Sequence, residues 1–301
     1  MTATTFSIII PTYNRISHLE LCLESIAALD YPKDSFEVIV VDDGSDQNPE
    51  DVIGAFKGTL DIRLIHQDHR GPASARNTGA TAGKNEYVVF TDDDCAAFPD
   101  WLSRFAVNFA DHPDYGIGGH TLNGLLRNPY SAASQLLIDY LYSYFNSNNR
   151  KARFFTSNNL AFPRKQFLEI GGFDATFPRA AGEDRELCYR WMKHGLELAY
   201  TPDVKLYHRH PLTFRMFLRQ HFNYGRGAFA YHQIRALRNI EPIRIEPFSF
   251  YLNLIRYPFR EQRSHSCGLL ALLMGITQLA NASGFFWEKF QFGEPQKSTD
   301  L

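Results

Sequence analysis

Strand-like and helix-like segments alternate along the first two hundred residues of the chain. Short apolar runs, several of them rich in β-branched residues, predict buried strands at residues 6–10, 36–41, 62–65 and 87–90. The stretches between these runs predict helices over residues 17–29, 49–56 and 72–82. The first of these helices opens with Ser17-His18-Leu19-Glu20, which has the capping-box pattern. The β-α-β-α-β-α-β order predicts an α/β fold in which helices flank a mostly parallel sheet.

Polar side chains follow three of the predicted strands at the points where these strands end. They belong to residues 11–15, 42–45 and 92–94. Because the carboxyl ends of parallel strands meet at one edge of an open sheet, and ligands bind beyond that edge, the three segments are expected to share one binding rim.

The hydrophobic pattern is looser beyond residue 100. It predicts helices at residues 101–110 and 183–193, and the second of these carries acidic residues near its start, where the helix dipole favours negative charge. Residues 1–210 are therefore expected to form the α/β domain, and residues 211–301 a helical C-terminal extension.

Residues 267–287 form the longest apolar stretch, which is long enough to cross a bilayer. Polar residues such as Thr277, Gln278 and Asn281 interrupt it. A stripe of small or polar residues at helical spacing suits close helix packing and comprises Gly268, Ala271, Gly275, Gln278 and Ala282. The stretch is compatible with a helix docked on the protein or lying on a membrane, with a core or homodimer helix, and with a transmembrane span.

The composition supports a folded protein and narrows its class. The chain has 301 residues, of which 44% are hydrophobic and 21% charged, as expected for a compact core. A net charge of -2 does not suggest a nucleic-acid binder, and we expect no nucleic-acid partner. The four cysteines are far apart in the sequence, which indicates neither a zinc site nor a disulfide framework. With no signal peptide recognisable at the N-terminus, a cytoplasmic location is expected.

The charge is distributed unevenly. Residues 210–265 contain nine arginines, no lysine and three glutamates, a balance of +6, so the remainder carries about -8. Within this segment Arg256 and Arg260 alternate with Tyr257 and Phe259, so that basic groups and aromatic rings could lie together at a lipid headgroup layer. Peripheral membrane contact and a solvated basic surface are the two interpretations.

Three consecutive carboxylates, Asp92, Asp93 and Asp94, follow the fourth predicted strand. Their mutual repulsion is costly unless a cation neutralises them, and oxygen ligands suit Mn²⁺ or Mg²⁺. The alternative is a solvated turn in which an aspartate caps the next helix. Asp42 and Asp43 end another strand on the same expected rim, where carboxylates could accept hydrogen bonds from a base or a ribose. The presence of Asp42 and Asp43 favours the metal site over the solvated turn.

At this point several short motifs, arriving in order, make a family recognisable. They are Ile8-Ile9-Ile10-Pro11-Thr12-Tyr13-Asn14-Arg15, Val40-Val41-Asp42-Asp43-Gly44-Ser45, Ala75-Arg76-Asn77-Thr78-Gly79, Thr91-Asp92-Asp93-Asp94 and Gly182-Glu183-Asp184-Arg185-Glu186-Leu187. The chain resembles family 2 glycosyltransferases of the GT-A (Rossmann-like) fold over about residues 6–210. That resemblance implies transfer of a sugar from a nucleotide sugar to an acceptor hydroxyl, with inversion and with a divalent cation.

The resemblance also assigns residues to the donor and metal sites. The residues implied to bind the nucleotide or the donor sugar are Pro11, Thr12, Asn14, Arg15, Asp42, Asp43, Arg76, Asn77, Asp92, Asp93 and Asn159. Asp94 is implied to coordinate the metal together with Asp92, and His208, which follows a predicted strand, is a further candidate ligand. His210 is a weaker candidate, and a turn role is favoured for Asp174.

The expected chemistry needs a base that takes the proton of the acceptor hydroxyl. Asp184 matches the family's base, and Glu183 could exchange roles with it. The alternative is that both residues only place negative charge at a helix N-terminus.

One motif of related enzymes is missing. The Gln-x-x-Arg-Trp motif of processive synthases is not present, because Leu187 stands where the glutamine would precede Arg190-Trp191. Transfer of a single sugar, most simply from a UDP-sugar to a sugar or lipid-linked acceptor in glycolipid or cell-surface polysaccharide synthesis, is therefore expected. The competing hypotheses are a noncatalytic nucleotide-sugar sensor or scaffold and a nucleotidylyltransferase. The sequence lacks the glycine-rich, lysine-containing N-terminal loop that is expected of a nucleotidylyltransferase.

Overall fold

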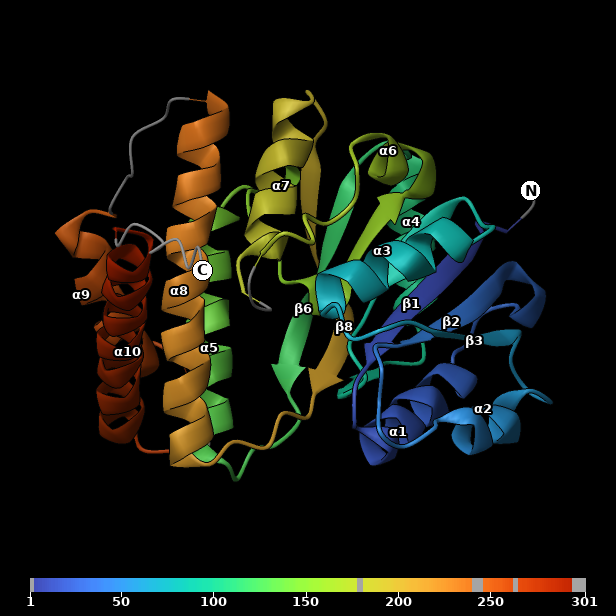
Figure 1. Ribbon diagram of the computed structural model, residues 1–301, viewed down its shortest axis with the longest axis horizontal. Helices are drawn as coiled ribbons and strands as arrows, with labels where there is room; N and C mark the ends of the chain where they lie inside the picture. Colours follow the sequence, from blue (N-terminus) through green and yellow to red (C-terminus); the bar gives the residue numbers. More distant parts are fainter. Residues whose placement is uncertain (1–2, 178–180, 240–245, 262–264, 294–301) are drawn as a thin grey trace, which may run out of the picture. The chain divides into compact units, whose positions relative to one another are not determined.

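The computed structural model describes residues 3–177, 181–239, 246–261 and 265–293. One sheet contains eight strands in the order β3-β2-β1-β4-β7-β6-β8-β5. The strands are β1 (Phe6–Thr12), β2 (Phe36–Asp42), β3 (Ile62–His66), β4 (Tyr87–Phe90), β5 (Cys95–Ala97), β6 (Gly116–Asn123), β7 (Leu160–Pro163) and β8 (Leu198–His208). The helices are α1 (Ile16–Ala27), α2 (Glu50–Phe56), α3 (Pro72–Ala82), α4 (Trp101–Asp111), α5 (Pro129–Phe145), α6 (Arg164–Glu169), α7 (Glu183–Lys193), α8 (Phe214–Asn239), α9 (Phe248–Arg256) and α10 (Cys267–Gly293). Figure 1 shows their arrangement.

The sheet is mixed, and four of its seven strand pairings are parallel, including that of β6 with β8, which confirms the expectation of a mostly parallel sheet. β3, β2, β1 and β4 run parallel, as the alternating pattern predicts. β7 then pairs antiparallel with both β4 and β6, and β5 pairs antiparallel with β8. The later strands lie in the part of the sequence where the hydrophobic pattern is loose, so neither they nor α5 were predicted as elements, apart from a strand ahead of His208.

Helices cover the two faces of the parallel part of the sheet. Side chains alternate between faces along a strand, and Ile8 and Ile10 of β1 belong to the core cluster that includes α1, α2 and α4. Ile9 points to the other face, towards α3, where a Cβ on Gly79 would collide with it. Figure 1 shows α3 on one side of these strands and α1 and α2 on the other. Gly79 therefore lets α3 lie directly on β1.

Two local predictions near β1 are wrong. The strand continues through Pro11 to Thr12 and does not stop at residue 10. Pro11 is tolerated there because β4 pairs with β1 only as far as Ile9, so the strand beyond has lost one neighbour. α1 begins at Ile16 with Arg15 at the N-cap position and no side-chain cap, so the capping box at residues 17–20 does not form.

The chain divides into two compact units. The first comprises residues 1–125, 141–176 and 183–210, and the second comprises residues 126–140, 177–182 and 211–301. The sheet and all the predicted site residues belong to the first unit. The second unit contains α8, α9 and α10 together with the first part of α5.

Within the second unit α8 and α10 lie side by side (Figure 1). Their backbones approach closely at Gly225 and Gly284, because a Cβ on either residue would collide with a carbonyl group of the other helix, at Asn281 and Phe222 respectively. The predicted small-residue stripe is not this contact: Gly268 has only Ser266 within 4 Å of an added Cβ. Among the described residues α10 is the one helix long and apolar enough to cross a membrane, which on its own is weak evidence for a span.

Candidate functional site

The acidic segment, residues 92–94, follows β4 at the carboxyl end of the parallel strands. The Thr12 hydroxyl donates a hydrogen bond of 2.8 Å to Asp93 Oδ2. Arg15 Nη1 lies 3.3 Å from Asp93 Oδ1 and 3.0 Å from Asp94 Oδ2. The segment that follows β1 therefore reaches the acidic segment, as the shared rim predicts.

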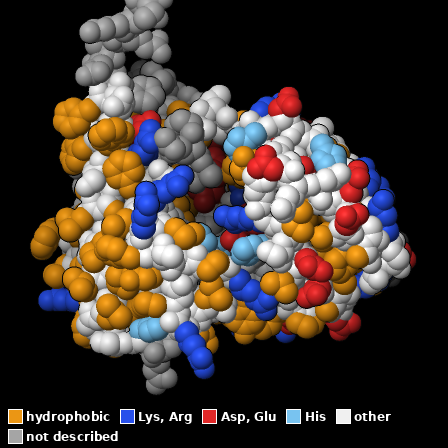
Figure 2. Space-filling view, turned by 60° about the horizontal axis from the view of Figure 1, so that its bottom comes forward, with side chains coloured by type: hydrophobic (Ala, Val, Ile, Leu, Met, Phe, Trp, Pro, Cys, Tyr) orange, Lys and Arg blue, Asp and Glu red, His pale blue; other side chains and the backbone are white. Residues whose placement is uncertain are grey.

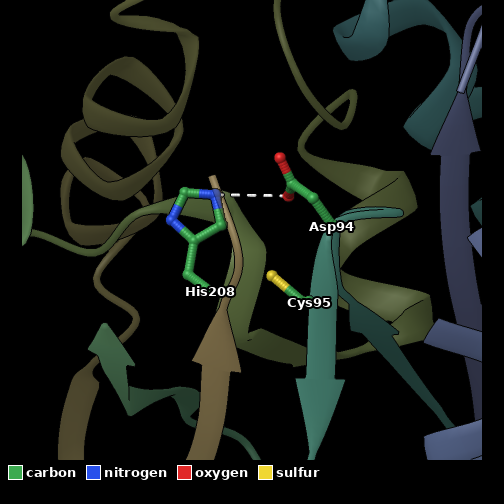
Figure 3. Close-up of side chains that lie close together, drawn as sticks. All are labelled: Asp94, Cys95 and His208. Atoms are coloured by element: carbon green, nitrogen blue, oxygen red, sulfur yellow. Dashed lines mark ion pairs between the residues drawn. The ribbon is translucent and has the colours of Figure 1, made fainter. Parts of the chain in front are cut away.

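Asp94 also faces His208 at the end of β8, and Figure 3 shows the two side chains pointing toward each other. His208 Nε2 lies 3.2 Å from Asp94 Oδ1. This buried oxygen accepts no well-aligned hydrogen bond from any group that the structure describes. Cys95 completes a group whose ligand atoms lie within 4.8 Å of one another. A buried carboxylate oxygen without a hydrogen bond, beside an imidazole, suits a divalent cation.

The charges around the acidic segment shift several pKa values. Burial raises the pKa of Asp93 to about 7, against the opposing effect of Arg15. Burial also acts to raise the pKa of Asp94, but the attraction of His208 and Arg15 outweighs it and holds this pKa below its usual value. Burial and the nearby carboxylates raise the pKa of the Cys95 thiol, so Cys95 is a neutral thiol when no metal ion is bound.

Arg76 of α3 connects the acidic segment to the start of α7. Its Nη2 donates a hydrogen bond of 2.7 Å to Asp92 Oδ1, and its Nη1 lies 3.5 Å from Glu183 Oε1. The guanidinium also lies over the ring of Phe173, 5.4 Å from its centroid. Arg76 and Glu183 are both buried. Arg76 is thus a positioning residue that brings the two predicted acidic sites together.

The two acidic residues at the start of α7 have raised pKa values. Burial, together with repulsion from Asp184, raises the pKa of Glu183 to about 7 although Arg76 opposes the shift. Burial raises the pKa of Asp184 to about 6, and the Arg185 backbone N–H, 2.7 Å from Asp184 Oδ1, acts in the opposite direction. Asp184 is partly exposed to solvent, whereas Glu183 is buried. A partly exposed carboxylate with a raised pKa is suited to general base catalysis.

Asp42 and Asp43 at the end of β2 are occupied by groups of this chain. Asp42 Oδ1 accepts a hydrogen bond from Ser45 N, and Asp42 Oδ2 lies 3.0 Å from His66 Nδ1. Asp43 has more partners, namely Gln67 Nε2 at 2.6 Å, Arg70 N at 2.9 Å and Gly71 N at 2.8 Å. The two carboxylates therefore shape the loop that follows β3, and their contact with a base stays a prediction.

Asn14 connects the segments that follow β1 and β2. It adopts a positive φ of 54° and exchanges hydrogen bonds with Asp46, to which its Nδ2 donates and from whose backbone N–H its Oδ1 accepts. The neighbouring Tyr13 stacks on His69, with 4.1 Å between ring centroids. Both rings are well exposed and lie beside the predicted nucleotide residues.

Asn159 is a correction to the predicted donor site. Its side chain is fully buried. Its Oδ1 accepts a hydrogen bond from Trp101 Nε1, and its Nδ2 donates to the carbonyl oxygens of His120 and Val204. Asn159 therefore holds α4, β6 and β8 together and cannot contact a donor.

Asn77 and Asp174 also serve local structure. Asn77 Nδ2 donates to Phe173 O at 2.7 Å and Asn77 Oδ1 accepts from Phe173 N at 2.8 Å, which fixes the loop after α6 against α3. Its role in donor binding stays a prediction. Asp174 accepts hydrogen bonds from both the N–H and the hydroxyl of Thr176, which confirms the turn role.

Several residues around the site were not predicted from the sequence. His66, Gln67 and His69 contact Asp42 and Asp43, and Phe173 lies on Arg76. The first three lie at or just after the end of β3, and they share the rim at the carboxyl ends of the parallel strands. Phe173 follows two glycines that mark a turn, and nothing in that local pattern reports its contact with Arg76.

Comparison with known families identifies the chain. Residues 7–171 match the profile of glycosyl transferase family 2, which is more than half of the sequence. The chain belongs to glycosyl transferase family 2. A second match, over residues 139–211, is to the N-terminal domain of galactosyltransferase. The second match includes α7 with Glu183 and Asp184, and it ends just past His208.

Curated relatives of the chain include bacterial glycosyltransferases. It is 28% identical over 238 residues to chondroitin synthase of Escherichia coli, covering 68% of this chain and 34% of the relative. It is 29% identical over 233 residues to the pre-mycofactocin glycosyltransferase of Mycobacterium tuberculosis, covering 74% of this chain and 46% of the relative. The chain thus spans between a third and a half of the length of these relatives.

Solved structures confirm the GT-A fold. A mannosyltransferase from Pyrobaculum calidifontis, in complex with GDP-Man and Mn²⁺, superposes with a TM-score of 0.63 at 22% identity, covering 97% of this chain and 85% of that one. Residues 1–349 of TarS from S. aureus superpose with a TM-score of 0.57 at 17% identity, covering 98% and 93%. At this level of identity the likeness concerns the fold alone.

Proposed function

We propose that this chain is an inverting, metal-dependent, nonprocessive glycosyltransferase that moves one sugar from a nucleotide sugar to an acceptor hydroxyl. The observation that carries the proposal is the meeting of two acidic groups through Arg76, which contacts Asp92 on one side and Glu183 on the other. One group has the chemistry of a cation site and the other that of a general base. Family membership supports a nucleotide sugar as the donor.

Asp94, His208 and Asp92 would hold the Mn²⁺ or Mg²⁺. Asp94 Oδ1, which accepts no well-aligned hydrogen bond, and the imidazole that faces it support the roles of Asp94 and His208. When bound, such an ion neutralises the charge that develops on a departing diphosphate. Arg15 pairs with Asp93 and Asp94 and carries a positive charge beside them when no ion is bound. Thr12 fixes the rotamer of Asp93 through its hydrogen bond.

Asp184 would remove the proton from the acceptor hydroxyl while that oxygen attacks the anomeric carbon. Attack from the face opposite the leaving diphosphate gives inversion in one step. A pKa of about 6 leaves the carboxylate mostly ionised at neutral pH and still basic enough to accept a proton. Glu183 contacts Arg76 and is buried, so it is better placed to hold Arg76 than to meet the acceptor.

Single transfer is supported by the use that the chain makes of Arg190 and Trp191. Arg190 forms an ion pair with Glu186 and donates to the carbonyl oxygens of Ile170 and Gly172. Trp191 is fully buried and donates to Glu197 O. Both residues serve local packing, and the glutamine of the processive motif is replaced by Leu187.

The donor, the acceptor and the location are proposed from the structural neighbours, the charge of the second unit and the cysteines. A UDP-sugar is our first choice; among the structural neighbours TarS was crystallised with UDP-GlcNAc and the mannosyltransferase with GDP-Man, so both bases belong in a screen. A sugar or a lipid-linked acceptor, in glycolipid or cell-surface polysaccharide synthesis, fits the basic second unit. All four cysteines are unpaired, which suits the cytoplasm.

The test measures donor-dependent transfer. The purified chain is incubated with UDP-, GDP- and dTDP-sugars, with Mn²⁺ or with a chelator, and the released nucleoside diphosphate and the product anomer are measured. Activity is expected to need the ion and to be lost on Asp94→Ala and on Asp184→Asn. Asp61→Asn is the matched control, because Asp61 is an exposed carboxylate paired with Lys84.

Unchanged turnover in both site variants would reject the site assignment. Saturable donor binding without transfer or donor hydrolysis across a broad acceptor panel would instead indicate a noncatalytic nucleotide-sugar sensor or scaffold.

A further inference from the structure

The second unit exposes an apolar face on α10. Residues that follow one another at steps of three and four lie on one side of this helix, and they comprise Leu269, Leu272, Ile276, Leu279, Ser283, Phe286 and Phe290. We refer to this set as the α10 outer face. Leu272 is 62% exposed, Leu279 71% and Phe290 72%. The residues on the other side of α10, such as Met274 and Thr277, are buried.

The α10 outer face carries no charge. Between residues 267 and 287 the sequence contains no Asp, Glu, Lys or Arg. An outward helix face in water normally carries charged residues, and the e and g positions of a soluble coiled coil do so as well. Twelve of the 17 large hydrophobic side chains exposed in the described residues belong to the second, smaller unit. Large exposed apolar patches are rare on monomeric soluble proteins, so this face is built for an apolar environment.

α9 extends the apolar surface and adds positive charge. It packs beside α10, where Ile255 Cδ1 comes within 3.7 Å of a Cβ added at Gly275. Phe248, the first residue of α9, is 80% exposed, and Phe259, three residues beyond the end of α9, is 64% exposed. Arg256 and Arg260 are exposed beside them. In Figure 2 hydrophobic side chains gather over the part of the molecule that contains α8, α9 and α10, with Lys and Arg side chains among them.

The contacts of α10 with α8 argue against a transmembrane orientation. The buried Glu288 of α10 forms an ion pair with Arg226 of α8. The close approach at Gly225 and Gly284 ties the two backbones together. α8 carries five arginines and therefore cannot enter the hydrocarbon with α10, and separating the helices would leave Glu288 without its partner.

We propose that the α10 outer face and α9 dock on the surface of an anionic lipid bilayer, with α10 lying in the plane of the interface. The apolar side chains enter the boundary between headgroups and acyl chains. Arg256 and Arg260 contact lipid phosphates. This is a property of the second unit and does not depend on the proposed transfer reaction, because it is measured without donor or acceptor.

The chain contains its own probe for this contact. Of its three tryptophans, Trp101 and Trp191 are fully buried, whereas Trp287 is 53% exposed and borders the α10 outer face. Vesicles that contain anionic phosphatidylglycerol are expected to shift the emission of Trp287 to shorter wavelength. Lipids brominated near the headgroup should quench it more strongly than lipids brominated near the chain end. Trp287→Phe should abolish both effects.

Vesicle flotation of the full chain measures the affinity. Leu279→Glu with Phe286→Glu is expected to weaken binding by about 100-fold or more, since two exposed apolar side chains no longer enter the lipid. Arg256→Gln with Arg260→Gln is expected to weaken binding to anionic vesicles by about 30-fold and binding to neutral vesicles little. Val107→Glu, at a 64% exposed position in the first unit, is the matched control and should bind as the parent does.

Several results would overturn the proposal. Failure of the parent chain to float with anionic vesicles would do so, as would stronger quenching from the chain end than from the headgroup region, which would mean a deeper insertion. A dimer in solution that Leu279→Glu with Phe286→Glu dissociates, without vesicle binding by the parent, would show that a second copy covers the face. An unchanged melting temperature in the variants establishes that each is folded.

Discussion

Replacing Arg76 by Met tests the connection between the two acidic groups. The change keeps a long side chain but removes the cation from between Asp92 and Glu183. The side chains of Arg76 and Glu183 are only 5% and 6% exposed, so the charge left on Glu183 is poorly solvated. Removing one partner of a buried ion pair costs about 3–5 kcal/mol. Since Asp92 is 28% exposed and can be hydrated, the lower end, about 3 kcal/mol, applies to unfolding measured at pH 9, where Glu183 with its pKa of about 7 is ionised.

The assay is thermal unfolding in the presence of a chelator, so that metal binding does not contribute. For a protein of this size each kcal/mol lowers the melting temperature by about 2–4 °C, and the expected decrease is about 6–12 °C. Arg104→Met is the matched control, because Arg104 and Asp100 form an ion pair whose side chains are about half exposed. Such a surface pair contributes about 0–1 kcal/mol, so this control should lose no more than about 4 °C.

The loss should also depend on pH. Without Arg76 the pKa of Glu183 rises above its present value of about 7, whereas in the unfolded chain it is about 4.3. An acid whose pKa is raised by folding does not destabilise the protein below the unfolded pKa, and its penalty grows as the pH rises from there to the folded pKa. The difference between the parent and Arg76→Met should therefore be larger at pH 8 than at pH 5. A decrease equal to that of Arg104→Met, or a larger loss at pH 5, would refute the reasoning.

Three further changes probe the site and its support. Arg15→Gln removes a competing cation from the acidic segment and should tighten Mn²⁺ binding, measured by electron paramagnetic resonance without donor, by about tenfold; weaker binding would show that Arg15 helps to form the ion site. The transfer rate at low donor concentration should rise with pH through about 6, the pKa of Asp184, and a rate that does not change between pH 5 and 7 would exclude Asp184 as the base. Gly79→Ala should cost about 1–3 kcal/mol in unfolding experiments because its Cβ collides with β1, whereas Gly54→Ala, with open space in α2, should gain up to about 1 kcal/mol; equal effects would contradict the packing argument.

The parts of the fold that the sequence predicted are those in which local pattern and tertiary structure agree. β1, β2 and β4 are short apolar runs buried on both sides, β3 is a partly exposed edge strand, and the helices between them are separated by clear turn residues. β6 contains Gly116, Gly118 and Gly119, residues with low strand propensity, and a Cβ on any of them would collide with neighbouring groups. Glycine is needed at these positions because neighbouring side chains leave no room for a Cβ. This requirement comes from tertiary packing, so the local sequence does not predict the strand.

The candidate site shows the same division. The acidic segment could be found because three charges in a row at a strand end demand a partner. Asn159 was misassigned because an amide in a polar motif looks the same in sequence whether it meets a ligand or three internal groups. The role of Arg76 depends on Glu183, which is 107 residues away, and no local pattern reports such a contact.

The neighbouring roles of Arg76 and Asn77 have a consequence for attempts to exchange parts between relatives. One residue holds the acidic groups and the next holds the loop that leads towards α7, where Gly172 with its φ of 64° leaves space for the Asn77 amide. A register slip of α3 by one position would break both attachments at once. Swapping the loop after α6 and the start of α7 of another enzyme into this chain should therefore succeed only when the matching α3 is transplanted with them.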